Sequence, residues 1–192
     1  MCHNLSMKLI FAAVLLVVTI VGSASGQVGY IGIYSDPAYT DCDLVDVVPP
    51  GVQLIYIVHR GSSGATTVQF RVVPSSGASC VLLGEDSPYN SILGDAESGI
   101  YIGFGGCVPS DNLVMTLSYF CDGASTTCSS IDIEADPDAS SGGIEITDCS
   151  LTPLVGTGAR LIINGDSSCP CGAIPPVREK TWGAIKALYR SF

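Results

Sequence analysis

The residues in this sequence with the clearest chemical potential are cysteines. The chain has nine, and Cys2 lies in a short segment ahead of an N-terminal apolar run. The other eight are Cys42, Cys80, Cys107, Cys121, Cys128, Cys149, Cys169 and Cys171. An even number of cysteines in a chain with an export signal predicts four disulfides, whereas a zinc site needs cysteine or histidine pairs at set spacing. Only Cys169-Pro170-Cys171 approaches that spacing, so we expect disulfides.

Sequence spacing leaves the pairing of these cysteines open, because eight cysteines permit about 105 arrangements. One pair is suggested by the loop that it would close. Cys121 and Cys128 enclose a short polar stretch that contains a glycine, and we predict that they bond to each other. Cys169 and Cys171 are such close neighbours that we expect them to bond to different partners.

The nucleophile chemistry open to this chain depends on His59, the one histidine that follows the apolar run. Any Ser–His or Cys–His mechanism must use it. The run Gly165-Asp166-Ser167 resembles the nucleophile motif of trypsin-like proteases, but Ser168 and Cys169 stand where that family has glycines. The chain has no G-x-S-x-G elbow, H-E-x-x-H helix or P-loop. A histidine at the end of an apolar strand is more typical of a strand-end residue than of a catalyst.

Two runs of acidic residues could supply oxygen ligands for Ca²⁺. They are Asp41, Asp43 and Asp46, and Asp132, Glu134, Asp136 and Asp138. Neither matches an EF-hand loop, and acids that alternate along a strand are typical of a solvated face. A carboxylate pair for glycoside hydrolysis also stays open, since the separation of the two groups is a tertiary property. Aromatic residues are dispersed along the chain and do not predict a sugar-stacking platform.

The charge balance excludes some classes of partner. The net charge is −10, with 18 acidic and 8 basic residues. Residues 178–192 hold four basic residues and one acid, a net charge of +3. Residues 27–177 hold three basic residues and 17 acids, a net charge of −14. A body this acidic argues against binding to nucleic acid or to anionic lipid.

The N-terminus is that of a secretory signal peptide. Lys8 precedes a thirteen-residue apolar run, Leu9–Val21, and Ala24-Ser25-Gly26 offers a cleavage site. We therefore predict a signal peptide at residues 1–26 and no transmembrane segment after its removal. Residues 27–174 are expected to form one domain, and residues 175–192 a proline break followed by a short tail.

Alternating apolar residues predict strands across that domain. Gly99–Cys121 is interpreted as a central β-hairpin, with Leu113, Met115, Leu117 and Tyr119 on the inner face of its second arm. Val52–His59 and Thr66–Val73 are interpreted as a second hairpin. The pattern weakens over residues 80–98, which are expected to be loop-like, with room for one short strand or turn of helix.

About eight short strands separated by Gly, Pro and Ser turns predict an all-β fold. Since each strand has one apolar face, two sheets can bury these faces against each other. We expect a disulfide-stapled antiparallel β-sandwich with a short C-terminal helix.

The tail, Thr181–Arg190, has an apolar stripe at helical spacing that is too short to be stable alone. The residues that fit a W-G-x-[IVL]-K-x-x-[YF]-R pattern are Trp182, Gly183, Ile185, Lys186, Tyr189 and Arg190. This ending resembles that of uncharacterised exported cysteine-rich β proteins of uncultured Gram-negative bacteria. The resemblance implies export and a tail that acts as an address or as a docking element, and the family has no established activity to carry over.

Taken together, these features predict a secreted, periplasmic or cell-surface protein that acts as a binding, adhesion or envelope-structural module. We expect no cofactor and no catalysis, and an unidentified protein or surface partner. Two alternatives stay open. One is a small extracellular hydrolase that uses His59 or a carboxylate pair, and the other is a secreted protein-binding inhibitor. A pocket with convergent polar groups indicates the enzyme, and an exposed apolar patch indicates the binding module.

Overall fold

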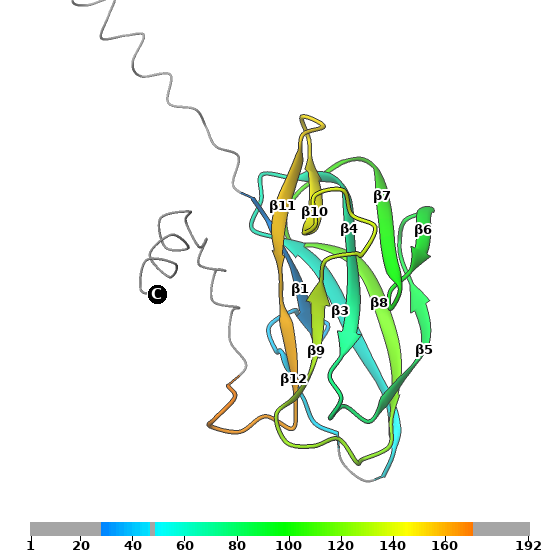
Figure 1. Ribbon diagram of the computed structural model, residues 1–192, viewed down its shortest axis with the longest axis vertical. Helices are drawn as coiled ribbons and strands as arrows, with labels where there is room; N and C mark the ends of the chain where they lie inside the picture. The colour runs from blue at the N-terminus through cyan, green and yellow to red at the C-terminus, as the bar shows by residue number, and fades with distance from the viewer. Residues whose placement is uncertain (1–27, 47–48, 171–192) are drawn as a thin grey trace, which may run out of the picture.

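The computed structural model describes residues 28–46 and 49–170, and this part of the chain is all-β (Figure 1). The signal peptide and tail predicted from the sequence lie outside these residues. The strands are β1 (Tyr30–Tyr34), β2 (Asp43–Leu44), β3 (Gly51–Arg60), β4 (Ala65–Pro74), β5 (Cys80–Asp86), β6 (Ser91–Asp95), β7 (Gly99–Val108), β8 (Asn112–Cys121), β9 (Ser129–Glu134), β10 (Ile144–Asp148), β11 (Pro153–Gly158) and β12 (Arg160–Ile163). No helix in the described part of the chain is long and apolar enough to cross a membrane.

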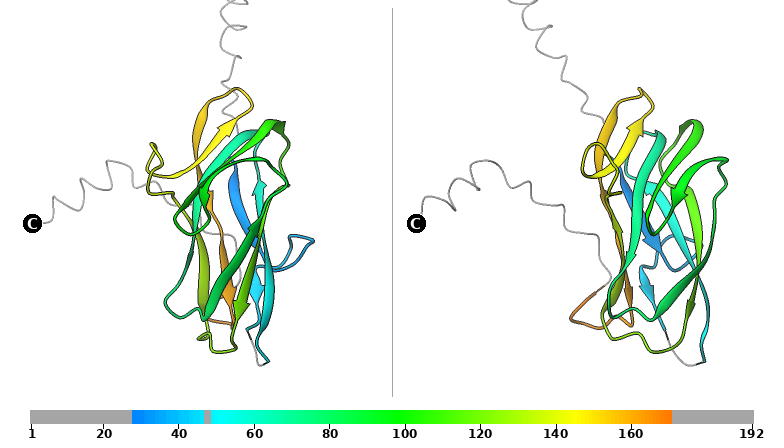
Figure 2. Two further views of the ribbon diagram at one scale, coloured as in Figure 1. Left: turned by 90° about the vertical axis from the view of Figure 1, so that its right-hand side faces the viewer. Right: turned by 45° about the vertical axis from the view of Figure 1, so that its right-hand side comes forward.

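The strands form a β-sandwich, as the sequence predicts (Figures 1 and 2). One layer has the order β11-β1-β3-β8-β5. In the other layer, β4 lies between β7 on one side and β10 and β9 on the other, and β6 and β12 extend it. β11 also pairs with β10, which joins the layers along one side. Pairing is antiparallel except for β1 with β11 and β12 with β2.

The core lies between the layers and is built from the alternating apolar residues of the long strands. Its largest fully buried side chains are Tyr119, Phe70, Ile31, Ile33, Ile55, Ile57, Ile100, Ile102, Met115, Leu117, Ile131 and Ile146. One position departs from strict alternation. The pairing of β3 with β8 shifts between Met115 and Leu113, which makes Val114 an extra residue and buries it beside Met115. The sequence pattern wrongly placed Leu113 on the inner face in its stead.

Both predicted hairpins are wrong, and for the same reason. β7 pairs with β4 and β6, whereas β8 pairs with β3 and β5, so the two arms of the Gly99–Cys121 segment lie in different layers. β3 and β4 are divided between the layers in the same way. Each of these strands has one strongly apolar face. A strand buries this face by packing against the opposite layer across the core. Such packing does not require the strand to pair with the next strand along the chain.

The segment expected to be loop-like with at most one short strand, residues 80–98, contains two strands, β5 and β6. All five residues of β6 are exposed, and so are Val81 and Leu83 of β5. Such strands cover little core, and hydrophobic alternation is therefore weak in their sequence. The same reasoning accounts for β11, which has no fully buried residue, whereas β2 has two residues and is too short to show a period. These strands bring the described part of the chain to twelve where about eight were expected.

Three disulfides join described residues. They are Cys80–Cys121, Cys107–Cys149 and Cys128–Cys169. The predicted Cys121–Cys128 bridge is therefore wrong. Cys80 and Cys121 are opposite residues of β5 and β8 with Cα atoms 4.1 Å apart, so the sheet register sets this bond and the intervening loop does not. Cys42 is also disulfide-bonded, and Cys171 lies outside the described residues.

Candidate protein-binding surface

His59 is fully buried near the end of β3. Its Nε2 lies 2.8 Å from the hydroxyl of Ser62, which also accepts a hydrogen bond from the Gly64 N–H at 3.0 Å. Its Nδ1 has no hydrogen-bond partner. Burial lowers the pKa of His59, and the nearby charge of Asp111 only partly opposes this shift.

This arrangement has two members of a catalytic triad but not the third. A general-base histidine needs a group on its second nitrogen that fixes the tautomer and stabilises the charged ring. The nearby carboxylate, Asp111, instead accepts a hydrogen bond from Arg60 Nε at 2.7 Å. Buried His59 and partly buried Ser62 thus form a polar pair that joins the end of β3 to the following turn.

Three acids of the second predicted group, Asp132, Glu134 and Asp136, are engaged by neighbouring strands, and Asp138 donates its backbone N–H to Asp136. Ion pairs join Arg71 to Glu134 and Arg160 to Asp132, and Gln69 donates a hydrogen bond to Asp136. These contacts fasten β9 to β4 and β12. They account for the alternating acids without a metal ion.

The first predicted acidic group is used in the same structural way. Its members are Asp41, Asp43 and Asp46. Asp46 is buried, and its carboxylate accepts N–H groups of Gly123 at 2.8 Å and Ser125 at 3.1 Å. Asp43 accepts the N–H of Gly165 at 3.1 Å. Within the described ranges, neither acidic run gathers three ligand groups around one point.

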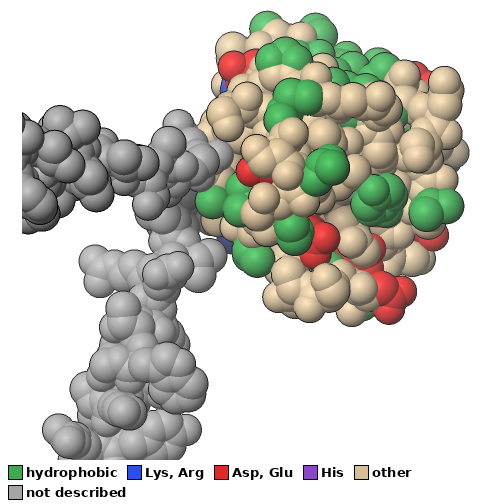
Figure 3. Space-filling model, turned by 90° about the horizontal axis from the view of Figure 1, so that it is seen from above, with side chains coloured by type: hydrophobic (Ala, Val, Ile, Leu, Met, Phe, Trp, Pro, Cys, Tyr) green, Lys and Arg blue, Asp and Glu red, His purple; other side chains and the backbone are tan. Residues whose placement is uncertain are grey.

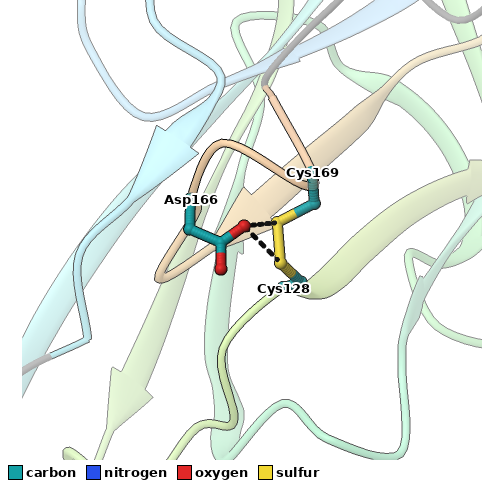
Figure 4. A group of neighbouring side chains, drawn as sticks. All are labelled: Cys128, Asp166 and Cys169. Carbon is teal, nitrogen blue, oxygen red and sulfur yellow. Dashed lines mark hydrogen bonds between the residues drawn. A yellow bond between two sulfur atoms is a disulfide. The ribbon is translucent and has the colours of Figure 1, made fainter.

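The ligand-type cluster that does occur in those ranges is Cys128, Asp166 and Cys169 (Figure 4). Asp166 Oδ1 lies 3.4 Å from the sulfur of Cys128 and 3.7 Å from that of Cys169. The two sulfurs are bonded to each other, so they carry no proton to donate and no thiolate charge for a metal. Hydrogen bonds from Ser168 lower the pKa of Asp166. The cluster is a structural bridge.

The most distinctive surface feature is a set of exposed apolar side chains on β3, β8 and β5. Val52, Phe120 and Val81 lie side by side across the three strands, and Leu54 follows Val52 on the same face. Leu83 occupies a bulge in β5 next to them. Their exposed fractions are 57, 40, 65, 45 and 60%, respectively. We call these five residues the apolar patch.

A second group lies on the same outer face, beyond the apolar patch along β3. It contains Tyr34 of β1, Tyr39, Tyr56 and Arg60 of β3, and Asp111. The ring centroids of Tyr39 lie 6.3 Å from Tyr34 and 5.9 Å from Tyr56. We call these five residues the Tyr–Arg cluster.

Arg60 holds the Tyr–Arg cluster together. It lies over the Tyr34 ring, 5.1 Å from the ring centroid, and donates hydrogen bonds to Tyr34 Oη and to the Tyr39 carbonyl oxygen. The contact with Asp111 raises its pKa. Gly32 makes room for this packing, because a Cβ at that position would lie 2.5 Å from the Tyr34 ring.

The loop that presents Tyr39 is fixed by Asp36. Its carboxylate accepts N–H groups of Ala38, Thr40 and Asp41 at 2.6–3.0 Å, and these bonds, that of Asp41 above all, lower its pKa. The backbone of Tyr39 has φ = 58°, a conformation that is rare for an aromatic residue. Tyr39 is therefore held in place by its own loop.

The two groups together give one face an apolar centre beside tyrosines and an arginine. Monomeric proteins seldom expose contiguous apolar surface, and interfaces are enriched in aromatic residues and arginine. Acidic side chains border the face, with Asp86 on β5 and Asp122 directly after β8. The upper end of the sandwich in Figure 1, which Figure 3 shows from above, is different. Hydrophobic and acidic side chains are interspersed there among other side chains.

The sequence did not reveal this face. Val81 and Leu83 lie in a stretch expected to be a loop, and the tyrosines appear dispersed until β1, β3 and the Asp36 loop bring them together. The predicted tail residues, Trp182 to Arg190, lie outside the described part of the chain.

No family model and no curated protein matches this chain. Similar solved structures include three cohesin modules. One is from the family 33 glycoside hydrolase of Clostridium perfringens, with 8% identity, a TM-score of 0.47 and coverage of 73% of this chain and 99% of the module. A non-cellulosomal cohesin from Archaeoglobus fulgidus has 8% identity and a TM-score of 0.47, and the match covers 70% of this chain and 90% of the cohesin. The seventh ScaB type I cohesin of Pseudobacteroides cellulosolvens has 14% identity and a TM-score of 0.42, and the match covers 79% of this chain and 96% of the cohesin. Likeness at this level carries no functional argument.

Proposed function

We propose that this chain is an exported, non-catalytic binding module that contacts a protein partner through the outer face of β1, β3, β8 and β5. The single observation that carries the proposal is the apolar patch. Five apolar side chains on three adjacent strands are exposed to solvent. Their burial against a partner would contribute about 25 cal/mol per Å² of apolar area to the free energy of binding. The Tyr–Arg cluster beside it supplies the residue types that anchor protein interfaces.

The charge of the domain indicates the chemistry of the partner. Residues 28–170 contain 17 acids and three arginines. Each arginine is ion-paired, with Asp111, Glu134 or Asp132. The partner that fits this face has apolar side chains at its centre and basic residues around them, and the opposite charges accelerate association.

Export to the periplasm or the cell surface is part of the proposal. It is supported by the predicted signal peptide and by disulfides, which persist in oxidising compartments. An inhibitor that acted through the same face would be a special case, distinguished by an enzyme as its partner. The hydrolase alternative gains no support from His59, because its Nδ1 is unpartnered and the ring is fully buried.

The proposal is tested by site-specific photo-crosslinking in the native envelope, with the crosslinking residue at Leu54. The expected result is a single predominant protein adduct. It should be lost on Val81→Asp and retained on Leu93→Asp. Val81 and Leu93 are matched, since they are 65% and 69% exposed and lie on edge strands of opposite layers. An adduct that both variants reduce equally, or no adduct in the native envelope, would overturn the proposal.

A further inference from the structure

The chain leaves the described domain at the same end as the apolar patch. Cys80, Cys121 and Gly51 form one row across β5, β8 and β3, and the patch begins one position further along. Cys128 follows Cys121 by seven residues and is bonded to Cys169, close to the end of the described chain. Figure 1 shows the start of β3, the end of β8 and this last segment at the lower end of the sandwich.

The remaining C-terminal residues can reach the patch. Residues 171–192 are 22 in number and span up to about 70 Å when extended, which exceeds the distance across a sheet of five strands. The exit point therefore permits the tail to return to the face of its own domain.

The composition of the tail complements the face. The apolar stripe of the predicted tail helix contains Trp182, Ile185, Leu188 and Tyr189, and ten residues at helical spacing need a surface to dock on. Residues 178–192 have a net charge of +3. The apolar patch contains no charged residue, and its borders have Asp86 and Asp122.

We propose that residues 178–192 dock on the apolar patch of the same chain, with the apolar stripe on Val52, Val81 and Phe120 and the basic residues near the bordering acids. The inference rests on the same surface as the proposed function and adds a regulation to it. The tail covers the patch in the free protein, and a partner must displace it. Engagement or removal of the tail thus exposes the binding face.

Trp182 is the single tryptophan of the chain, so its fluorescence reports on docking in the intact mature protein. We expect blue-shifted emission and slow acrylamide quenching in the wild type. Val81→Asp should shift the emission to the red and increase quenching, and Leu93→Asp should leave both unchanged. Lys186→Glu combined with Arg190→Glu should act like Val81→Asp, and this variant alters no residue of the sandwich.

Three outcomes overturn the docking proposal. They are solvent-like Trp182 emission in the wild type, equal shifts in the Val81→Asp and Leu93→Asp variants, and emission that depends on protein concentration, which would place the tail on a second copy. The readout needs no partner. Solvent-like Trp182 together with the Leu54 adduct refutes docking alone, and protected Trp182 without an adduct refutes the proposed function alone.

Discussion

Removal of the Cys80–Cys121 disulfide tests how the binding face is held together. The two cysteines face each other across β5 and β8, one position from Val81 and Phe120. The sequence separation is 41 residues, for which the chain-entropy relation gives about 4 kcal/mol of stabilisation. We expect Cys80→Ala/Cys121→Ala to lower the free energy of unfolding by roughly 2–4 kcal/mol. β5 is an edge strand with few buried side chains, so we also expect it to open locally.

The Cys107–Cys149 bridge is a matched control. Its separation is 42 residues, so the same relation gives the same stabilisation, but it joins β7 to the turn between β10 and β11. Urea unfolding followed by circular dichroism measures the global loss, and amide hydrogen exchange of Val81–Asp86 measures local opening. Cys80→Ala/Cys121→Ala should lose at least as much stability as the control, because Cys121 is buried whereas Cys107 and Cys149 are exposed, and only Cys80→Ala/Cys121→Ala should lose protection in β5. Equal protection of β5 in the two variants, or an unchanged free energy of unfolding without Cys80–Cys121, would refute the reasoning.

Four further predictions follow from the sequence and the structure. Burial lowers the pKa of His59 below its ordinary 6.5, so the unfolded chain binds this proton more tightly. The contribution of His59 to the free energy of unfolding should therefore be complete above pH 6.5 and be lost as the pH falls below it. His59→Gln should flatten this pH dependence when the free energy of unfolding is measured by urea titration at each pH; parallel pH profiles of variant and wild type contradict the reasoning. Gly32→Ala should displace the Tyr34 ring and break the hydrogen bond that Arg60 donates to Tyr34. The free energy of unfolding, measured by thermal unfolding, should fall by about 1 kcal/mol. The intact mass of the exported protein should match a chain that starts near Gln27 and is eight hydrogen atoms lighter than its reduced form; a smaller difference refutes four bridges. Deletion of residues 178–192 should lower the melting temperature if the tail docks, whereas unchanged stability with misdirected protein would identify an address.

Much of the fold could be predicted because the core strands leave a strong pattern. Ile100, Ile102 and Phe104 of β7 alternate with smaller residues, and all three are buried as expected. Alternation specifies which face of a strand is buried, but not which neighbour the strand pairs with. That difference is why both hairpins were wrong although their inner faces were mostly correct.

The disulfides show a related limit. Cys121 and Cys128 are near in sequence, but the bonds follow the sheet register, which places Cys121 opposite Cys80. Spacing along a chain constrains a disulfide only when the loop folds locally. Here β8 ends at Cys121, and the loop that follows it leads to Cys128, which is bonded to Cys169 near the end of the described chain.

The apolar patch that we propose binds a partner was hidden from the sequence for a physical reason. A strand buried on one face must keep that face apolar, and its sequence therefore alternates. β5 has exposed apolar residues at Val81 and Leu83 and only a partly buried Leu82 between them, which makes it an almost continuous apolar run without a period. The sequence of β5 does not alternate because Val81 and Leu83 point away from the core. This lack of alternation is also what made the segment look like a loop. An apolar edge strand whose sequence fails to alternate is thus a pattern worth reading as exposed apolar surface, which is the surface that we propose binds a partner. Phe120 marks the same surface from the neighbouring strand, because it is exposed between buried Tyr119 and Cys121.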